Sequence, residues 1–229
     1  MKTCEKCQAS GIDRTKVCRK CRLDITKRED EMLENMTFGS YYNIDYIANR
    51  DSKEPIEWIV LAKEGNKALL ISKYGIDSKQ YNKDCTSVTW ESSTIRKWLN
   101  NEFINCAFNS SEQDKIQLTC VKNPDNMEYG TEGGNDTSDK IFLLSIDEVM
   151  KYFKDNSARM CKPTVYATSQ GAYEECEYEI GYGLWWLRSP GVQQNRAAVI
   201  SCGGLVGARG NLVHCTGCGV RPAMWVSLA

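Results

Sequence analysis

Four cysteines near the start of the chain have the spacing of a metal site. Cys4 and Cys7 form one C-x2-C pair, and Cys18 and Cys21 form a second pair after ten intervening residues. Thiolates from two such pairs complete the tetrahedral shell that Zn²⁺ adopts in structural sites. All four positions are cysteine, so no position remains for a catalytic water. The spacing therefore predicts a structural zinc ribbon in residues 1–22.

Outside this motif the chain lacks the side chains on which most hydrolytic sites depend. It has 229 residues but a single histidine, His214, so Ser-His or Cys-His pairs and histidine-based metal sites are hard to assemble. We expect no catalytic residues and predict that the protein is not an enzyme. Its 29 Lys and Arg residues nearly balance 30 Asp and Glu residues. That balance argues against general binding of nucleic acids.

The chain also lacks apolar segments of the kind that direct a protein to a membrane or anchor it there. It has no apolar run of the roughly 18 residues that a spanning helix needs. Its first residues are polar and contain cysteines, unlike a signal peptide. We expect no membrane span and a cytoplasmic location, with later display on a cell surface or a virion left open.

The elements that must position any functional residue are predicted from periodicity and turn signals. Residues 23–36 are charged and contain no Gly or Pro, which predicts a helical linker between the zinc ribbon and a main domain at residues 37–229. Two apolar runs, Ile56–Ala62 and Lys67–Ser72, predict a β-hairpin that turns at Gly65.

Helices are expected to begin at Ser93, near Ser110 and at Ser145, because each serine can cap the apolar or acidic pattern that follows it. Between the last two, residues 121–139 are rich in Asn, Asp and Gly, which predicts a long loop. Residues 141–144 are apolar and predict a strand.

The last fifty residues consist of short apolar runs separated by glycines. They predict short strands joined by tight turns, including a hairpin turn at Gly203-Gly204. The runs are Trp185–Gly191, Ala197–Ile200, Leu205-Val206, Leu212-Val213 and Val220–Val226. With the helices, they predict an α+β fold of short antiparallel strands and two or three helices.

Five segments, in this order, resemble a bacterial domain family of uncharacterised function that is common in gut Firmicutes. They are EWIVLAKEGNKALLIS, TWESSTIRKWLNNEFINCAF, DKIFLLSIDEV, WWLRSPG and GVRPAMWV, and the resemblance covers residues 37–229. That family is related to the C-type-lectin-like fold shared with formylglycine-generating enzymes, which implies a ligand-display scaffold. The chain is similar in a further respect to the variable proteins of diversity-generating retroelements. In these, adenine-directed mutagenesis rewrites a C-terminal segment so that it binds new ligands.

The composition of the C-terminal segment fits such rewriting. When the adenines of an AAC or AAT codon are randomised, the third base stays a pyrimidine, so Lys, Glu, Gln, Met and Trp never appear. These types supply 51 of the residues in Met1–Val192, yet none occurs between Asn195 and Ala223. Chance gives such an absence with a probability on the order of one in ten thousand. We therefore predict a variable ligand-binding segment at about residues 192–218.

Two sets of residues are predicted within this region. A fixed frame is small or apolar and comprises Ala197, Ala198, Ile200, Gly204, Val206, Gly210, Val213 and Gly219. The ligand-binding set can all be encoded by such rewritten codons and comprises Asn195, Arg196, Val199, Ser201, Cys202, Gly203, Leu205, Gly207, Ala208, Arg209, Asn211, Leu212, His214, Cys215, Thr216, Gly217 and Cys218. Because alternate side chains of a strand face opposite sides, the frame is expected to pack inward and the second set to point outward.

The expected ligand is a protein or a glycan, bound as by an antibody paratope on a rigid scaffold. Beneath this surface we expect the core to hold Ile200, Val206 and Val213 together with Trp185, Trp186, Leu187 and Trp225. The two adjacent tryptophans are thus expected to pack in the core rather than to stack on a sugar.

Two other functions remain open. One is a zinc-ribbon adaptor whose large domain binds a fixed protein partner. The other is an enzyme of the formylglycine-generating type, which would use Cys202, Cys215 and Cys218 as active-site thiols. Cys215 and Cys218 also have the spacing of a metal-binding pair. Arg188 and Arg221 are expected to hold loops together by hydrogen bonds rather than to bind an anion.

Overall fold

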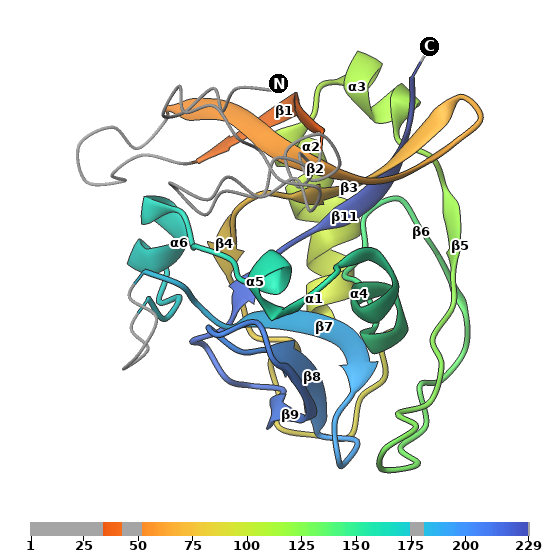
Figure 1. Ribbon diagram of the computed structural model, residues 1–229, viewed down its shortest axis with the longest axis vertical. Helices are drawn as coiled ribbons and strands as arrows, with labels where there is room; N and C mark the ends of the chain where they lie inside the picture. The colour runs from red at the N-terminus through yellow and green to blue at the C-terminus, as the bar shows by residue number, and fades with distance from the viewer. Residues whose placement is uncertain (1–33, 43–51, 175–180, 229) are drawn as a thin grey trace, which may run out of the picture. The chain divides into compact units, whose positions relative to one another are not determined.

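The computed structural model describes residues 34–42, 52–174 and 181–228. The predicted zinc ribbon and nearly all of the predicted linker lie outside these ranges. Apart from Glu34, the described residues belong to one compact unit, Asn35–Ala229. This unit combines short helices with mostly antiparallel sheets, which confirms the predicted α+β class (Figure 1). None of the helices in the described ranges has the length and apolar character that crossing a membrane requires.

A four-stranded antiparallel sheet combines the beginning and the end of the domain. Its order is β1-β2-β3-β11, with β1 at Asn35–Tyr42, β2 at Lys53–Glu64, β3 at Lys67–Ser72 and β11 at Ala223–Ser227. The hairpin predicted around Gly65 is confirmed by the pairing of β2 with β3.

The last residues of the helical linker predicted at residues 23–36 are in a strand instead. Asn35 and Met36 are the first residues of β1 and pair with Ile59 and Trp58 of β2. Met36 also packs against the hydrophobic core. Pairing and packing with the distant β2 therefore override the helical composition of the preceding residues.

A five-stranded sheet contains the C-terminal segment. Its order is β4-β10-β7-β8-β9, with β4 at Asp77–Ser78, β7 at Trp185–Pro190, β8 at Arg196–Ile200, β9 at Val206–Leu212 and β10 at Gly219–Val220. β10 runs parallel to β7, and the other pairs are antiparallel. In Figure 1 the blue strands β7, β8 and β9 lie side by side, with β9 at the edge of the sheet.

Two predicted groups of strands differ from the observed ones. The runs predicted at Leu205-Val206 and Leu212-Val213 form one strand, β9, because pairing with β8 continues across the polar residues between them. The run predicted at Val220–Val226 is divided at Arg221-Pro222, where the chain passes from the five-stranded to the four-stranded sheet. Proline lacks the amide hydrogen that a continuous ladder requires.

The helices begin close to the predicted caps. Ser93 caps a continuous helical segment, and capping boxes formed by Asn109 with Glu112 and by Ser145 with Glu148 begin two further helices. The helices are α1 (Thr94–Trp98), the π-helical turn η2 (Leu99–Phe103), α2 (Ile104–Ala107), α3 (Ser110–Lys115), α4 (Ile146–Tyr152), α5 (Asn156–Arg159) and α6 (Val165–Ser169). The sequence patterns did not indicate α5 and α6.

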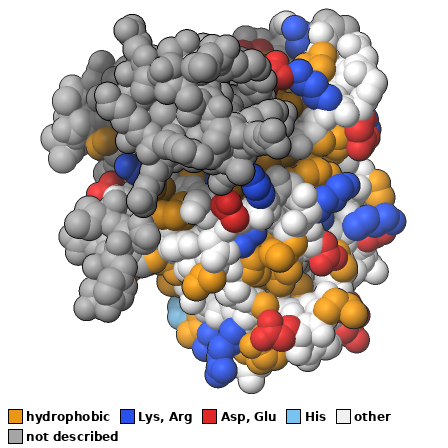
Figure 2. All heavy atoms as spheres, viewed as in Figure 1, with side chains coloured by type: hydrophobic (Ala, Val, Ile, Leu, Met, Phe, Trp, Pro, Cys, Tyr) orange, Lys and Arg blue, Asp and Glu red, His pale blue; other side chains and the backbone are white. Residues whose placement is uncertain are grey.

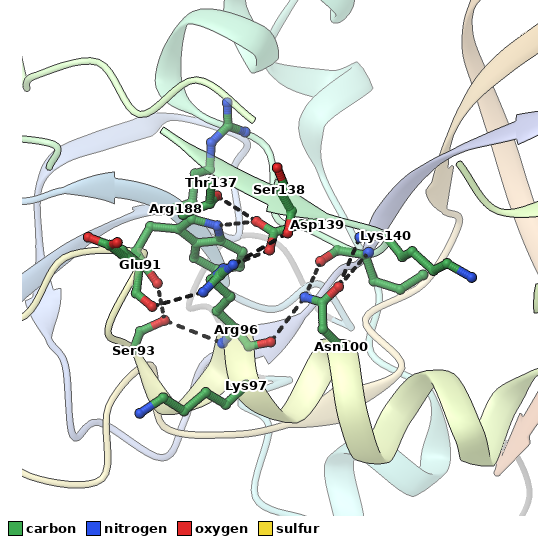
Figure 3. Close-up of polar contacts among 12 residues, drawn as sticks. Glu91, Ser93, Arg96, Lys97, Asn100, Thr137, Ser138, Asp139, Lys140 and Arg188 are labelled. Carbon is green, nitrogen blue, oxygen red and sulfur yellow. Dashed lines mark hydrogen bonds and ion pairs between the residues drawn. The ribbon is translucent and has the colours of Figure 1, made fainter. Parts of the chain in front are cut away.

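The stretch predicted as a long loop is partly a two-stranded ribbon, in which β5 (Thr119–Val121) pairs with β6 (Thr137–Asp139). The buried carboxylate of Asp139 fastens this ribbon to the helical segment (Figure 3). It accepts hydrogen bonds from Arg96 Nε at 2.7 Å and from Trp90 Nε1 at 2.9 Å. The ribbon is therefore held by an ion pair that is largely shielded from water.

The apolar run at residues 141–144 is buried but does not form a strand. Ile141, Leu143 and Leu144 are fully buried, and Phe142 makes a single bridge to Ala223 of β11. This prediction was wrong because a short apolar run indicates burial without specifying a ladder partner.

Candidate functional site

The predicted frame of the C-terminal segment lies inside the domain. Ala197, Ala198, Ile200 and Val213 are each 0% exposed. Of the other four, Gly204 and Gly219 are buried, and Val206 and Gly210 are half-buried. The packing of Trp185, Trp186 and Leu187 in the core is also confirmed, and Trp225 packs against it while partly exposed.

Most of the residues predicted to bind ligand lie at or near the surface. Leu205, Arg209 and Thr216 are exposed, and the apolar side chain of Leu205 is 59% exposed. The half-buried members are Asn195, Arg196, Ser201, Gly203, Gly207, Ala208, Asn211, Leu212, His214 and Cys215. On the face shown in Figure 2, positively charged, negatively charged and hydrophobic side chains of the described residues are interspersed. The side chain of the chain's only histidine, in pale blue, is visible on this face.

Four residues predicted to point outward are buried instead, which corrects the simple alternation expected for this segment. They are Val199, Cys202, Gly217 and Cys218. Val199 lies on β8, which is paired on both sides by β7 and β9, and a register shift between Ala197 and Val199 interrupts the alternation. Cys202 is disulfide-bonded, so its thiol is not free for catalysis. These four residues are therefore not part of the exposed surface.

Side chains from distant parts of the chain hold the backbone of the segment in place. Asn126 Nδ2 donates to the carbonyl oxygens of Pro190 at 2.8 Å and Ala208 at 2.9 Å. Arg159 Nε donates to the carbonyl oxygen of Gly204 at 2.9 Å. Sequence reasoning missed both residues, because a polar residue in a loop or a short helix carries no signal of a partner many positions away. The backbone of β9 and of its preceding turn is thus fixed independently of the outward side chains.

Two glycines of the frame have no room for a side chain. Gly204 has a φ of +76°, and a Cβ placed there would lie 1.8 Å from the carbonyl oxygen of Asn156. Gly210 has a φ of +71°, and its Cβ would lie 2.4 Å from the carbonyl oxygen of Ala197. Both positions therefore require glycine for two reasons, backbone conformation and space.

The three glycines predicted to be variable differ in the space around them. At Gly203 an added Cβ would meet nothing within 4 Å. At Gly207 its nearest neighbours would be Val199 Cγ2 at 3.1 Å and the Val199 carbonyl oxygen at 3.3 Å, which are both tight contacts. At Gly217 it would overlap the Tyr173 ring, and this glycine is one of the four buried exceptions. Of the three, Gly203 thus has the open space that side-chain variation needs.

Two polar atoms in the segment are left without a partner. Among the described residues, Asn195 Oδ1 and His214 Nδ1 are buried and have no hydrogen-bond partner. A buried polar atom without a partner costs about 1–3 kcal/mol.

Arg188 holds loops together, as expected from the sequence. Its side chain is buried, with 3% exposed. Nη1 donates to the carbonyl oxygen of Leu143 at 2.7 Å, and Nη2 donates to the carbonyl oxygen of Lys122 at 2.7 Å. The guanidinium also forms a bidentate ion pair with the Glu148 carboxylate. These bonds engage its guanidinium group within the fold.

Arg221 has the same kind of role. Its Nε donates to the carbonyl oxygen of Ser72 at 2.8 Å, and its guanidinium lies 4.9 Å from the centre of the Trp185 ring. The structure thus supports the expectation that neither arginine is placed to receive an anion from solvent.

The described ranges contain no group of three or more His, Cys, Asp or Glu side chains arranged to hold a metal ion. Cys215 and Cys218 therefore have no third ligand from that part of the chain. The four cysteines of the predicted zinc ribbon, Cys4, Cys7, Cys18 and Cys21, lie outside the described residues, and zinc binding there stays a prediction.

Comparison with known proteins gives one family. A family model described as a domain of unknown function, DUF6273, matches residues 65–228, which is most of the chain and includes the whole C-terminal segment. No curated protein and no solved structure matches the chain.

Proposed function

The chain belongs to the DUF6273 family, and we propose that its C-terminal segment is a diversified ligand-binding surface carried on a C-type-lectin-like scaffold. In this proposal the protein is a display protein of a diversity-generating retroelement and not an enzyme. The frame residues keep the backbone fixed while their neighbours are replaced from one copy of the gene to the next.

The observation that carries the proposal is the contrast between the two kinds of glycine. Gly204 and Gly210 were assigned to the frame because small or apolar residues alternate with the others along this segment, and backbone carbonyl oxygens occupy the space that a side chain would need there. Gly203 was assigned to the variable set, and a Cβ added there would meet nothing within 4 Å. The sequence pattern and the available space are independent criteria, and at these three positions they agree.

The burial pattern supports the same division. Ala197, Ala198, Ile200 and Val213 have no exposed surface, so replacing them would disturb close packing. Leu205, Arg209 and Thr216 are exposed, so their replacement changes the surface without changing the core.

The chemistry of the exposed set fits a macromolecular ligand. Arg209 and Thr216 offer polar contacts and Leu205 an apolar one, all supported by the backbone of β9 and its flanking turns. Antibody paratopes combine adaptable polar and apolar contacts on a rigid framework in the same way. We propose a protein or glycan ligand whose identity changes with the variant.

A pair of libraries tests the proposal. In the first, codons for Gly203, Leu205, Arg209, Asn211 and Thr216 are randomised at their first two bases with cytosine kept at the third. In the matched control library the same codon replaces Ala197, Ala198, Ile200, Gly204 and Val213. Both are displayed as the full chain, scored for resistance to protease, and selected against a panel of purified proteins and immobilised glycans.

We expect most clones of the first library to stay protease-resistant and some to bind panel members, and most clones of the control library to be digested. The proposal is contradicted if both libraries lose resistance equally, or if a folded surface library yields no binder to any member of the panel.

A further inference from the structure

Two free cysteines lie together in the turn between β9 and β10. The segment Cys215-Thr216-Gly217-Cys218 connects the edge strand of the five-stranded sheet with one of its inner strands. Both thiols are free. Neither belongs to the frame described above. The display hypothesis places both in the predicted ligand-binding set, which gives them no redox role.

The two thiols differ in access. Cys218 is 1% exposed, and Asn211 Nδ2 lies 3.4 Å from its sulfur. Cys215 is only half-buried, so a reagent can approach its sulfur from solvent. Two residues, Thr216 and Gly217, separate the cysteines within this turn. The pair therefore has one outer thiol and one inner thiol in the same turn.

The surroundings favour a thiolate on the outer cysteine. The hydrogen bond from Cys218, the backbone N–H of Gly217 and the neighbouring His214 lower the pKa of Cys215 to about 6. The same hydrogen bond and burial raise the pKa of Cys218 well above its ordinary value. A thiolate attacks disulfides and a thiol does not, so Cys215 is the nucleophile of the pair.

The turn that contains the pair is held at several points. Ser78 Oγ donates to the carbonyl oxygen of Thr216, and Tyr173 N donates to that of Gly217 at 3.0 Å. Gln80 Nε2 donates to the carbonyl oxygen of His214 at 2.7 Å. These bonds come from residues far away in the sequence, and they fix the backbone of the turn that contains both cysteines.

We propose that Cys215 and Cys218 form a redox-active dithiol that exchanges with low-molecular-weight or peptide disulfides. The Cys215 thiolate attacks one sulfur of the disulfide, which forms a mixed disulfide and releases the first thiolate. Cys218 then gives up its proton and attacks Cys215 Sγ, which closes the Cys215–Cys218 disulfide and releases the second thiolate. The two released thiolates take up protons, so one disulfide is reduced to two thiols while the protein dithiol is oxidised by two electrons. This activity goes beyond ligand display and does not depend on it.

Oxidised glutathione is the probe for this exchange, applied to the full native chain at neutral pH. The reaction is quenched with acid, remaining thiols are alkylated, and the protein is digested with trypsin. The peptide at residues 210–229 contains Cys215 and Cys218 and no other cysteine. Its mass therefore reports on this pair alone, separately from Cys202, which lies in the preceding tryptic peptide.

In the wild-type protein we expect this peptide to lose two hydrogens while two glutathione thiols are released. In Cys218→Ala the reaction stops at a glutathione mixed disulfide on Cys215, and in Cys215→Ala the buried Cys218 stays unmodified. The exposed Cys120 serves as an internal control that forms no intramolecular disulfide. The inference is overturned if the wild-type peptide ends as a stable mixed disulfide, or if Cys215 reacts no faster than Cys120. Retained protease resistance of both variants shows that a negative result is not due to unfolding.

Discussion

At the scale of single residues, the sharpest prediction concerns Gly204 and Gly210, where the structure leaves no space for a side chain. Gly204→Ala places a methyl group against the carbonyl oxygen of Asn156 in a left-handed conformation, and Gly210→Ala does the same against Ala197. We expect each to lower the free energy of unfolding by about 2–4 kcal/mol, from backbone strain and overpacking together. Urea unfolding of the purified variants measures this.

Gly203→Ala is the matched control, because it adds the same methyl group one residue away in open space. Its free energy of unfolding is expected to stay within about 0.5 kcal/mol of the wild type. If Gly203→Ala destabilises as much as Gly204→Ala, the distinction between frame and surface glycines fails.

The thiol pair gives a prediction about pH. Because the pKa of Cys215 is lowered to about 6, its thiolate is protonated as the pH falls through 6, and its rate of alkylation by iodoacetamide should fall with it. Above that pH the rate should reach a plateau. The measurement is the alkylation rate of the peptide at residues 210–229 between pH 5 and pH 9, a range chosen to span the ordinary thiol pKa of about 8.5.

The variant Cys218→Ala removes the main hydrogen-bond donor to that thiolate. The pKa of Cys215 should then rise, and its alkylation rate at pH 6 should fall about fivefold to tenfold, after allowing for the lower nucleophilicity of a low-pKa thiolate. An unchanged pH profile in this variant would show that Cys218 does not activate Cys215.

At the scale of elements, the link between the β5–β6 ribbon and the helical segment depends on one carboxylate. Asp139 is 1% exposed and accepts from Arg96 and Trp90. Asp139→Ala leaves these donors without their acceptor, so we expect the free energy of unfolding to fall by about 3 kcal/mol. Chemical denaturation followed by tryptophan fluorescence measures the change.

Lys122→Ala provides the comparison, since the ion pair of Lys122 with Asp136 lies beside the same ribbon but is open to solvent. Exposed pairs contribute little, so the denaturation midpoint should not move measurably. Equal effects of the two substitutions would contradict the structural role given to Asp139.

Local signals predicted some elements and failed for others. The caps at Ser93 and Ser145 and the hairpin around Gly65 depend on neighbouring residues, and the structure confirms them. The ribbon at Thr119–Val121 was missed because its partner strand lies across a stretch with loop composition. Likewise, Met36 follows a helical pattern but pairs with a distant strand.

The candidate ligand-binding surface, like the fold, was predicted only in part from the sequence. The alternation of small or apolar residues with the others separated the frame from the exposed Leu205, Arg209 and Thr216 without any structure. It failed at Val199, because strand alternation assumes one exposed face, whereas the consecutive residues Ala197–Ile200 of β8 are all buried. It also gave no sign of Asn126 or Arg159, whose hydrogen bonds to the segment arise only in the folded chain.

At the scale of the whole molecule, the N-terminal cysteines predict a zinc ribbon in addition to the domain at Asn35–Ala229. Four thiolates from Cys4, Cys7, Cys18 and Cys21 are the donor set that structural zinc prefers, and we expect one zinc ion per chain by elemental analysis. Cys7→Ser should lose it, while Cys120→Ser, a substitution in the described domain, should retain it. Because Asn35–Ala229 is a compact unit of its own, its unfolding midpoint should not change in Cys7→Ser. Native protein without zinc would refute the ribbon.

The central claim is that the C-terminal side chains were rewritten on a fixed frame, and the DNA around the gene tests it most directly. The measurement is the sequence of the flanking DNA, searched for a near-copy of the segment that encodes residues 192–223. We predict such a copy beside a reverse-transcriptase gene, with every mismatch at an adenine of the copy and none that changes Ala197, Ile200, Gly204 or Val213. A flanking region without any copy, or a copy whose mismatches fall on all four bases and on frame codons alike, would contradict the account.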